Sequence, residues 1–182
     1  FSMLEFPVRE LAGRTLGIVG YGTLGRAVAR VAEAFGMTVR IAQRPGGPRA
    51  EGRVDLDELL EAADVLTLHC PLTPATRGLI GAAQLARMKP DAVLINTARG
   101  GLVDAHALAG ALRERRLGGA AIDVLEEEPP GAGDPLLAPD LQNLIVTPHT
   151  AWAAREARQR AIDEVAANVE DFRRGGNRGR VV

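Results

Sequence analysis

The stretch "TLGIVGYGTLGR", residues 15–26, decides the fold. An apolar run is followed by three glycines in the pattern G-x-G-x-x-G, at Gly20, Gly22 and Gly25, and a segment of helical period begins directly after them. The first glycine permits a tight turn, the second lets the backbone approach a pyrophosphate, and the third lets a helix pack closely on a strand. The stretch therefore predicts a strand, a phosphate-binding turn and a helix, although the glycine pattern alone also fits an ordinary strand-to-helix turn.

The remainder of the chain alternates in the same way. Apolar runs rich in β-branched residues predict strands at 15–20, 37–42, 65–69, 92–96, 119–124 and 143–147, and segments of helical period predict helices at 23–35, 57–63, 104–115 and 151–172. Strands that alternate with helices form a parallel sheet with helices on both faces. The predicted fold class is α/β, a doubly wound parallel sheet of the Rossmann dinucleotide-binding type.

Two apolar patterns near the N-terminus carry further expectations. Within the first predicted helix, Leu24, Val28, Val31 and Phe35 lie on one stripe. An apolar stripe on a surface helix faces the core, so we expect these side chains to pack on the sheet. Residues 1–14 also carry apolar side chains at helical spacing, with no capping sequence ahead of them. This spacing predicts a helix that enters from a segment upstream.

Composition and charge narrow the classes of function. The chain has 182 residues, of which 46% are hydrophobic, enough to bury a substantial core. Its formal net charge is -1 and the charged residues are dispersed, so no nucleic-acid partner is expected. One cysteine excludes an internal disulfide, and no apolar run resembles a membrane span or a signal peptide, which indicates a cytoplasmic protein with no membrane partner. Because His69, Cys70, His106 and His149 lack close ligand spacing, no metal site is expected.

The segment after the second predicted strand bears on the cofactor. NAD-binding chains usually place an acidic residue about twenty residues beyond the glycines, where it binds the ribose hydroxyls. Gln43 and Arg44 stand there instead, with Arg49 nearby in the sequence. A guanidinium can pair with the 2′-phosphate of NADP, so Arg44 favours use of NADP as well as NAD. In the alternative, Arg44 is a solvated loop residue, Gln43 binds the ribose, and the cofactor is NAD.

Candidate reacting groups follow three later strands. Arg99, then Asp123 with Glu128, then His149 come at or just after the carboxyl ends of predicted strands, and in a parallel sheet these ends meet at the ligand-binding edge. Hydride transfer to a 2-oxo acid needs a cation for the carboxylate and carbonyl and a group that exchanges a proton, which arginine and histidine provide. Glu128 is the candidate carboxylate that would favour the charged imidazole. Taken singly, each residue also fits a surface or helix-capping role.

Five segments together are similar to a known family. They are "GIVGYGTLGR" (17–26), "HCPLTPATRGLIG" (69–81), "MKPDAVLINTARGGLVD" (88–104), "GAAIDVLEEEP" (119–129) and "LIVTPHTAW" (144–152). In this order they resemble the nucleotide-binding domain of the D-isomer-specific 2-hydroxyacid dehydrogenases over nearly the whole chain. The run ending in "HTAW", with "REARQR" after it, resembles the glycerate dehydrogenase, or hydroxypyruvate reductase, branch of that family.

The resemblance implies an oxidoreductase that transfers a hydride between NAD(P)H and a small D-2-hydroxy or 2-oxo acid. Arg99 would hold the substrate carboxylate and polarise its carbonyl, His149 would be the acid-base residue, and Glu128 would be its carboxylate partner. The implied cofactor contacts, besides the three glycines, are Thr23 and Leu24 at the pyrophosphate, Cys70 and Pro71 on the adenosine side, Thr76 near the cofactor, Thr97 and Ala98 near the nicotinamide ribose, and Asp123 at the carboxamide. Trp152, where many relatives have glycine, shapes the substrate pocket in one interpretation and anchors the last helix in the core in the other.

Members of this family insert the domain into a substrate domain built from sequence on both sides of it. The resemblance therefore implies a fragment of a two-domain, homodimeric enzyme, with a linker or helix at 1–13, the dinucleotide-binding domain at 14–150, and a long helix and return segment at 151–182. With only one wall of its cleft, the chain is expected to be inactive alone. Two alternatives stay open: a domain that binds S-adenosylmethionine for group transfer, and a nucleotide-sensing module without catalysis.

Overall fold

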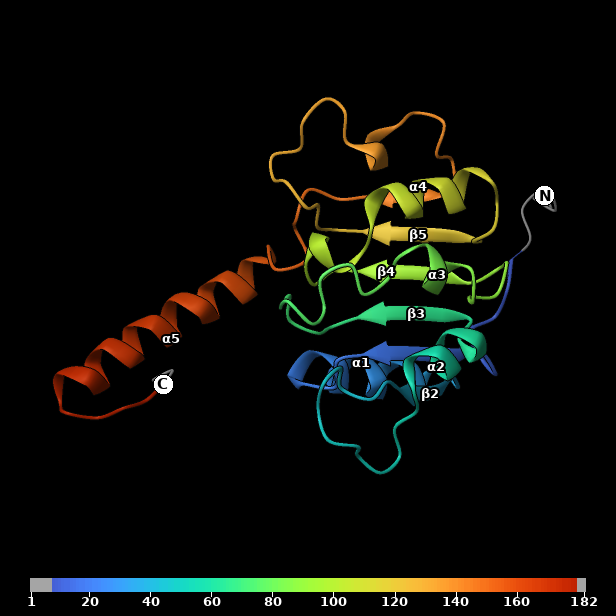
Figure 1. The fold of residues 1–182 in the computed structure, drawn as a ribbon. Coiled ribbons are helices and arrows are strands. Elements are labelled where there is room, and N and C mark those ends of the chain that lie inside the picture. Colours follow the sequence, from blue (N-terminus) through green and yellow to red (C-terminus); the bar gives the residue numbers. More distant parts are fainter. Residues whose placement is uncertain (1–7, 180–182) are drawn as a thin grey trace, which may run out of the picture. The chain divides into compact units, whose positions relative to one another are not determined.

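A parallel β-sheet forms the centre of the fold. In the computed structural model, which describes residues 8–179, six strands pair in the order β2-β1-β3-β4-β5-β6, and every neighbouring pair is parallel. The strands are β1 (Thr15–Val19), β2 (Thr38–Ile41), β3 (Val65–Leu68), β4 (Val93–Asn96), β5 (Gly119–Ile122) and β6 (Leu144–Val146). Because the chain moves outward from β1 to β2 and then returns to the other side of β1, the strand order reverses between β1 and β3. The predicted α/β fold is confirmed (Figure 1).

Helices pack on both faces of this sheet. These helices are α1 (Thr23–Ala34), α2 (Leu56–Ala62), α3 (Ala82–Leu85) and α4 (Ala105–Arg113). The last helix, α5 (Arg155–Arg173), follows β6 in the chain, and two short 3-10 helices are η1 (Gly100–Leu102) and η2 (Pro135–Leu137). On one face, Leu60 of α2, Leu85 of α3 and Leu108 of α4 belong to one buried core, and these three helices lie in front of the sheet in Figure 1. On the other face, Ala29 of α1 packs with Ile18 of β1 in a second core.

The buried face of α1 differs from the prediction. The expected stripe is largely in solvent, since Leu24, Val31 and Phe35 are 69%, 57% and 60% exposed. The buried residues of the helix are Gly25, Ala29 and Ala32. A Cβ on Gly25 would overlap the Gly20 carbonyl oxygen, so the helix approaches the sheet along its smallest side chains. The prediction was therefore wrong for these three residues, because the close approach at the glycine turn, and not hydrophobicity, determines which face of the helix packs on the sheet. Val28 is half-buried and does pack against the core.

The two ends of the chain also refine the predictions. Of the helix expected at 1–14, residues 1–7 lie outside the described residues, and residues 8–14 form no helix, so that part was wrong. The last helix begins at Arg155 instead of residue 151, after a turn that contains Trp152. The chain divides into two compact units, one ending at Pro148 and the other beginning at His149. Within residues 8–179, no helix combines the length and the apolar character needed to cross a membrane.

Candidate active site

The glycine turn lies where the strand order reverses, between β1 and α1. Gly20 has φ of 99°, and a Cβ there would approach the backbone of His69 and Cys70 to 2.5 Å, so the turn is pressed against the end of β3. Gly22 precedes α1 and faces open space, with no atom within 4 Å of the place where a Cβ would stand. No side chain of the described residues caps this helix. Its first N–H groups, at Thr23 and Leu24, are therefore available to a pyrophosphate.

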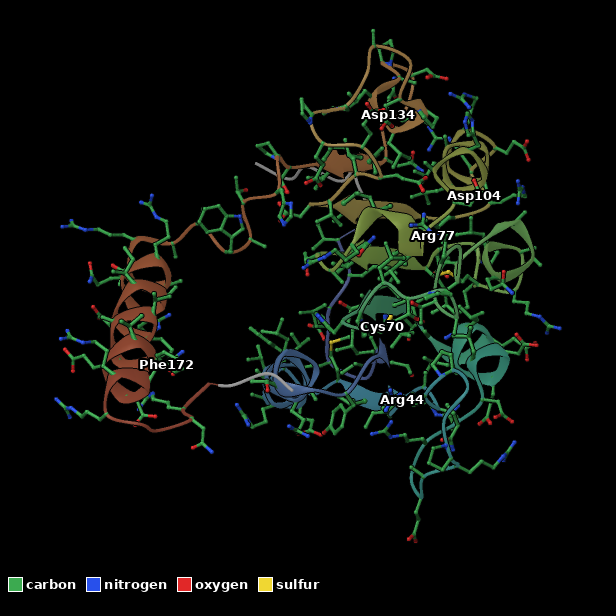
Figure 2. The ribbon with its side chains drawn as sticks, turned by 60° about the vertical axis from the view of Figure 1, so that its left-hand side comes forward. Arg44, Cys70, Arg77, Asp104, Asp134 and Phe172 are labelled. Carbon is green, nitrogen blue, oxygen red and sulfur yellow. The ribbon has the colours of Figure 1, made fainter. Side chains whose placement is uncertain are left out.

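The segment after β2 runs beside this turn. Ile41 pairs with Ile18 of β1, and Figure 2 shows Arg44 on the chain that leaves β2. Arg44 is exposed, and its guanidinium has no hydrogen-bond or ion-pair partner among residues 8–179. Arg49, by contrast, is held by Asp55 at 2.9 Å and 3.1 Å. Gln43 turns its amide toward its own loop. A contact between Arg44 and the 2′-phosphate of a bound cofactor stays a prediction.

The loop after β3 is closed by Thr76. Its buried hydroxyl donates to the Pro71 carbonyl at 2.7 Å and accepts from the Thr73 N–H at 2.8 Å, so Thr76 shapes the loop from inside. Cys70, labelled in Figure 2, is buried, and this burial raises the pKa of its thiol. His69 lies 3.0 Å from the Thr67 hydroxyl, and burial lowers its pKa. Of the predicted contacts in this loop, Pro71 is exposed, and Cys70 and Thr76 are enclosed.

The Arg99 loop after β4 is built on a residue that the sequence analysis missed. Asn96 is 1% exposed, and its side chain accepts from the Ala98 N–H at 3.0 Å and donates to the Arg99 carbonyl at 2.9 Å. These bonds fold the backbone of Thr97 and Ala98 into a turn beyond the strand. The Arg99 side chain is exposed and donates to the Ala98 carbonyl at 2.6 Å. A polar residue that ends a buried apolar run was the available signal for Asn96.

The loop after β5 lies directly against the Arg99 loop. A Cβ on Gly100 would overlap the Leu125 carbonyl and the Glu126 N–H, so the two backbones touch. Glu128 is exposed and accepts from the Leu125 N–H at 2.8 Å, which turns its carboxylate back toward the end of β5. Asp123 is 5% exposed and accepts a hydrogen bond from the Thr147 hydroxyl beyond β6. Sheet edge and loop contact thus bring Arg99, Asp123 and Glu128 to one region.

His149 opens the second unit, directly after the β6 segment and Pro148. It is half-buried, and its φ of 52° lies in the left-handed region, which residues other than glycine seldom adopt. Its pairing with Glu128 stays a prediction. Trp152 is 60% exposed, which does not fit a core anchor within its own unit.

A hollow of about 710 Å³ borders the same two loops on another side. Its lining includes Arg77, Asp104 and Asp134, labelled in Figure 2, and Arg77 donates to Glu126 across 2.7 Å. None of the predicted catalytic residues is among its lining residues. The candidate active site is therefore the strand-end region and not this hollow. Among the described residues, no group of His, Cys, Asp and Glu is arranged to hold a metal ion.

A six-stranded parallel sheet with a G-x-G-x-x-G turn at its switch point defines a dinucleotide-binding domain. The chain belongs to a particular family of such domains: residues 1–151 match the family model "D-isomer specific 2-hydroxyacid dehydrogenase, NAD binding domain". The resemblance noted in the sequence is thereby confirmed.

Individual relatives agree with this placement. The chain is 51% identical over 172 residues to a glycerate dehydrogenase of Methylorubrum extorquens, covering 94% of this chain and 54% of that protein. It is 38% identical to a hydroxypyruvate reductase of Blautia hydrogenotrophica, with 94% and 54% covered. The NAD-complexed D-isomer specific 2-hydroxyacid dehydrogenase of Lactobacillus delbrueckii ssp. bulgaricus superimposes with a TM-score of 0.85 at 30% identity, over 100% of this chain and 60% of the other.

An acyclic imino acid reductase in complex with NADPH and D-Arg also superimposes with a TM-score of 0.85, at 34% identity over 94% of this chain and 55% of that one. The chain spans about half the length of the curated relatives it matches, at 54% of each of the two named above.

Proposed function

We propose that the chain is the cofactor-binding half of an NAD(P)-dependent D-2-hydroxyacid dehydrogenase that acts on a small acid of the glycerate and hydroxypyruvate type. One observation carries the proposal: the glycine turn, the Arg99 loop and the Glu128 loop all follow the carboxyl ends of strands in one parallel sheet. The similarity to a glycerate dehydrogenase at 51% identity supports the substrate class.

The residues present fit a dinucleotide. Gly20 and Gly25 allow contacts that a Cβ would block, and Gly22 leaves an open surface at the start of α1. The bound nicotinamide would supply or accept the hydride. In our proposal the cofactor is held by the three glycines, by Thr23 and Leu24, by Arg44, by the loop of Cys70, Pro71 and Thr76, and by Thr97, Ala98 and Asp123 around the nicotinamide end.

The proposed chemistry belongs to three side chains. Arg99 would bind the substrate carboxylate and stabilise charge that develops on the carbonyl oxygen, because its guanidinium is exposed at the end of β4. His149 would donate a proton to that oxygen during reduction, and Glu128 would orient the imidazole. The three residues would thus act as one unit beside the nicotinamide.

Arg44 leads us to propose that NADPH is accepted as well as NADH. The guanidinium beside the glycine turn has no carboxylate partner in the described residues, whereas a ribose-binding acid at this position would repel a 2′-phosphate. A structural neighbour that holds NADPH supports the fit of this fold to either cofactor. We further propose a homodimer that works in the cytoplasm, in line with the family resemblance and the single cysteine.

Oxidation of NADH and NADPH by the full-length protein with hydroxypyruvate, glyoxylate and pyruvate tests the activity. We expect turnover with hydroxypyruvate, and oxidation of D-glycerate but not L-glycerate in the reverse direction. Arg99→Gln and His149→Ala should reduce kcat by at least about a thousandfold while the Kd of NADH changes little. Absence of turnover with every 2-oxo acid, or retained turnover in His149→Ala, would contradict the proposal.

A second candidate is cofactor binding without catalysis by this chain alone, favoured by its span of about half of its relatives. The 182-residue chain should then bind NADH but oxidise none of it with hydroxypyruvate, because water would enter the open site. Turnover by this chain at the rate of the full-length protein would rule out the second candidate.

A further inference from the structure

The loop that carries Arg44 is closed at its base by backbone pairing. Ala42 forms an isolated parallel bridge with Val54, the Gln43 N–H donates to the Val54 carbonyl at 2.8 Å, and the Val54 N–H donates to the Ile41 carbonyl at 2.9 Å. Ala42 also donates to the Ile18 carbonyl of β1 at 2.9 Å. The base of the loop is therefore tied to the strand that leads into the glycine turn.

The Gln43 side chain ties the two arms of the loop together. Its Nε2 donates to the Ala50 carbonyl at 3.0 Å and to the Arg53 carbonyl at 3.2 Å, and its Oε1 accepts from the Ala50 N–H at 3.0 Å. A carboxamide has two N–H donors, and both are used here. Gln43 therefore offers no donor to a ribose hydroxyl in this arrangement. Its role at the cofactor edge is to hold the loop.

Arg44 lies between this clamp and a tight turn. The Gly47 N–H donates to the Arg44 carbonyl at 3.0 Å, with Pro45 second in the turn and Gly46 third at φ of 66°. A Cβ on Gly47 would come within 3.0 Å of Arg44 Cδ and 3.1 Å of its Cβ and Cγ, so the Arg44 stem lies along the Gly47 backbone. Backbone and stem of Arg44 are thus both positioned, while the guanidinium has no partner among residues 8–179.

We propose that Gln43 is a positioning residue that sets the preference between NADPH and NADH through Arg44. Its carboxamide fixes the loop so that the Arg44 guanidinium meets the 2′-phosphate without first ordering the segment, which lowers the entropic cost of binding. This inference rests on the proposed function, in which Arg44 binds the 2′-phosphate. NADH, which lacks that phosphate, gains little from the clamp.

A double-mutant cycle tests the clamp in the full-length protein. Calorimetric titration gives the Kd of NADPH and of NADH for wild type, Gln43→Ala, Arg44→Ala and the double variant. We expect Arg44→Ala to weaken NADPH by about tenfold to a hundredfold, and Gln43→Ala by about fivefold, with the Kd of NADH changed less than about twofold. In the Arg44→Ala background, Gln43→Ala should shift the ratio of the two Kd values by less than about twofold. Arg49→Ala, in the same loop but paired with Asp55, is the matched control and should leave the ratio unchanged.

The possible results separate the two proposals. If Arg44→Ala leaves the ratio of the NADPH and NADH Kd values unchanged, Arg44 does not bind the 2′-phosphate. Both the proposed role of Arg44 and the proposed role of Gln43 are then overturned. If Arg44→Ala shifts the ratio and Gln43→Ala weakens both cofactors equally, or adds its full effect to Arg44→Ala, only the clamp is overturned. Should Gln43→Ala not fold, Gly47→Ala takes its place, since the new Cβ displaces the Arg44 stem. Gly47→Ala should weaken NADPH by about threefold and leave NADH unchanged, and an unchanged ratio overturns the inference.

Discussion

At the residue scale, the positions of the Arg99 and Glu128 loops depend on contacts made by two other residues, Gly100 and Asn96. Gly100 has no side chain, and this absence lets the loop of Arg99 touch the loop of Glu128. The side chain of the buried Asn96 donates a hydrogen bond to the Arg99 carbonyl. Neither residue would touch a substrate in our proposal, but Gly100 lets the two loops come into contact and Asn96 fixes the backbone of the Arg99 loop.

Gly100→Ala should therefore reduce activity without removing a reacting group. The new Cβ would overlap the Leu125 carbonyl and separate the two loops, so kcat/KM with hydroxypyruvate should fall by about tenfold to a hundredfold. Gly110 of α4 is the matched control, because a Cβ there meets no atom within 4 Å. Gly110→Ala should leave kcat/KM unchanged and increase the free energy of unfolding by roughly 0.5–1 kcal/mol. Equal activity in both variants would contradict a positioning role for Gly100.

Asp64, next to the start of β3, links stability to pH. Its carboxylate accepts from the Thr15 N–H at 2.7 Å and from Lys89 at 2.9 Å, and Arg14 lies 3.7 Å away. Burial alone would raise the pKa of Asp64, but the hydrogen bonds from Thr15 and Lys89 and the nearby positive charges outweigh it and lower the pKa. The unfolded state then takes up a proton more readily than the folded state. Stability from Asp64 is present above the ordinary aspartate pKa of about 3.9 and is lost as the pH falls below it.

Urea unfolding across this pH range measures the effect. Asp64→Asn should lower the free energy of unfolding by about 1–2 kcal/mol at neutral pH and flatten its decline below about pH 4. Glu61→Gln, which breaks the exposed pair with Arg87, is the control and should cost less than about 0.5 kcal/mol. A pH profile of Asp64→Asn that parallels wild type would show that Asp64 is not the group responsible.

At the element scale, α1 shows how a local rule can override hydrophobic periodicity. Its apolar stripe predicts packing through Val31, but the helix packs through Ala29 and Ala32. Val31→Gln should change the free energy of unfolding by less than about 0.5 kcal/mol, whereas Ala32→Gln should cost more than about 2 kcal/mol. Denaturant midpoints of the two variants compare the faces directly. A larger loss for Val31→Gln would restore the stripe as the packed face.

The other elements show which features the sequence could predict. Strands and long helices were predicted well because each is an apolar run or a helical period several residues long, such as β3 and α4. The four-residue α3 and the 3-10 helices η1 and η2 were missed, since a single turn has no measurable period. The start of α5 was placed too early, because Trp152 extends the apolar pattern into a turn.

The candidate site, like the helices and strands, could be predicted only where the sequence carries a motif or a regular pattern. The glycine turn and the residues after β4 and β5 follow from motif and strand order, and the structure brings Arg99 and Glu128 to touching loops. The role of Gln43 could not be predicted, because its three hydrogen bonds reach residues seven and more positions away across a folded loop. Asn96 carried one signal, as a polar residue at the end of a buried apolar run, but its bonds to the backbone of Ala98 and Arg99 leave no spacing pattern in the sequence.

At the scale of the whole molecule, the central proposal concerns one edge of the sheet. In our proposal, one edge of the parallel sheet would bind a nicotinamide dinucleotide across the glycine turn, and Arg99, Glu128 and His149 would act on a 2-oxo acid there. His149 begins the second compact unit, so its place in this set stays a prediction. The full-length protein is therefore the right sample for a test of the proposal.

A crystal structure of the full-length protein with NADPH and oxamate, an unreactive analogue of a 2-oxo acid, tests this claim most directly. We predict the pyrophosphate on the backbone N–H groups at the start of α1, the 2′-phosphate on Arg44, the oxamate carboxylate on Arg99, and the His149 ring between oxamate and Glu128. A dinucleotide bound away from the glycine turn would contradict the account. So would an oxamate molecule that contacts only one of Arg99 and His149, or neither.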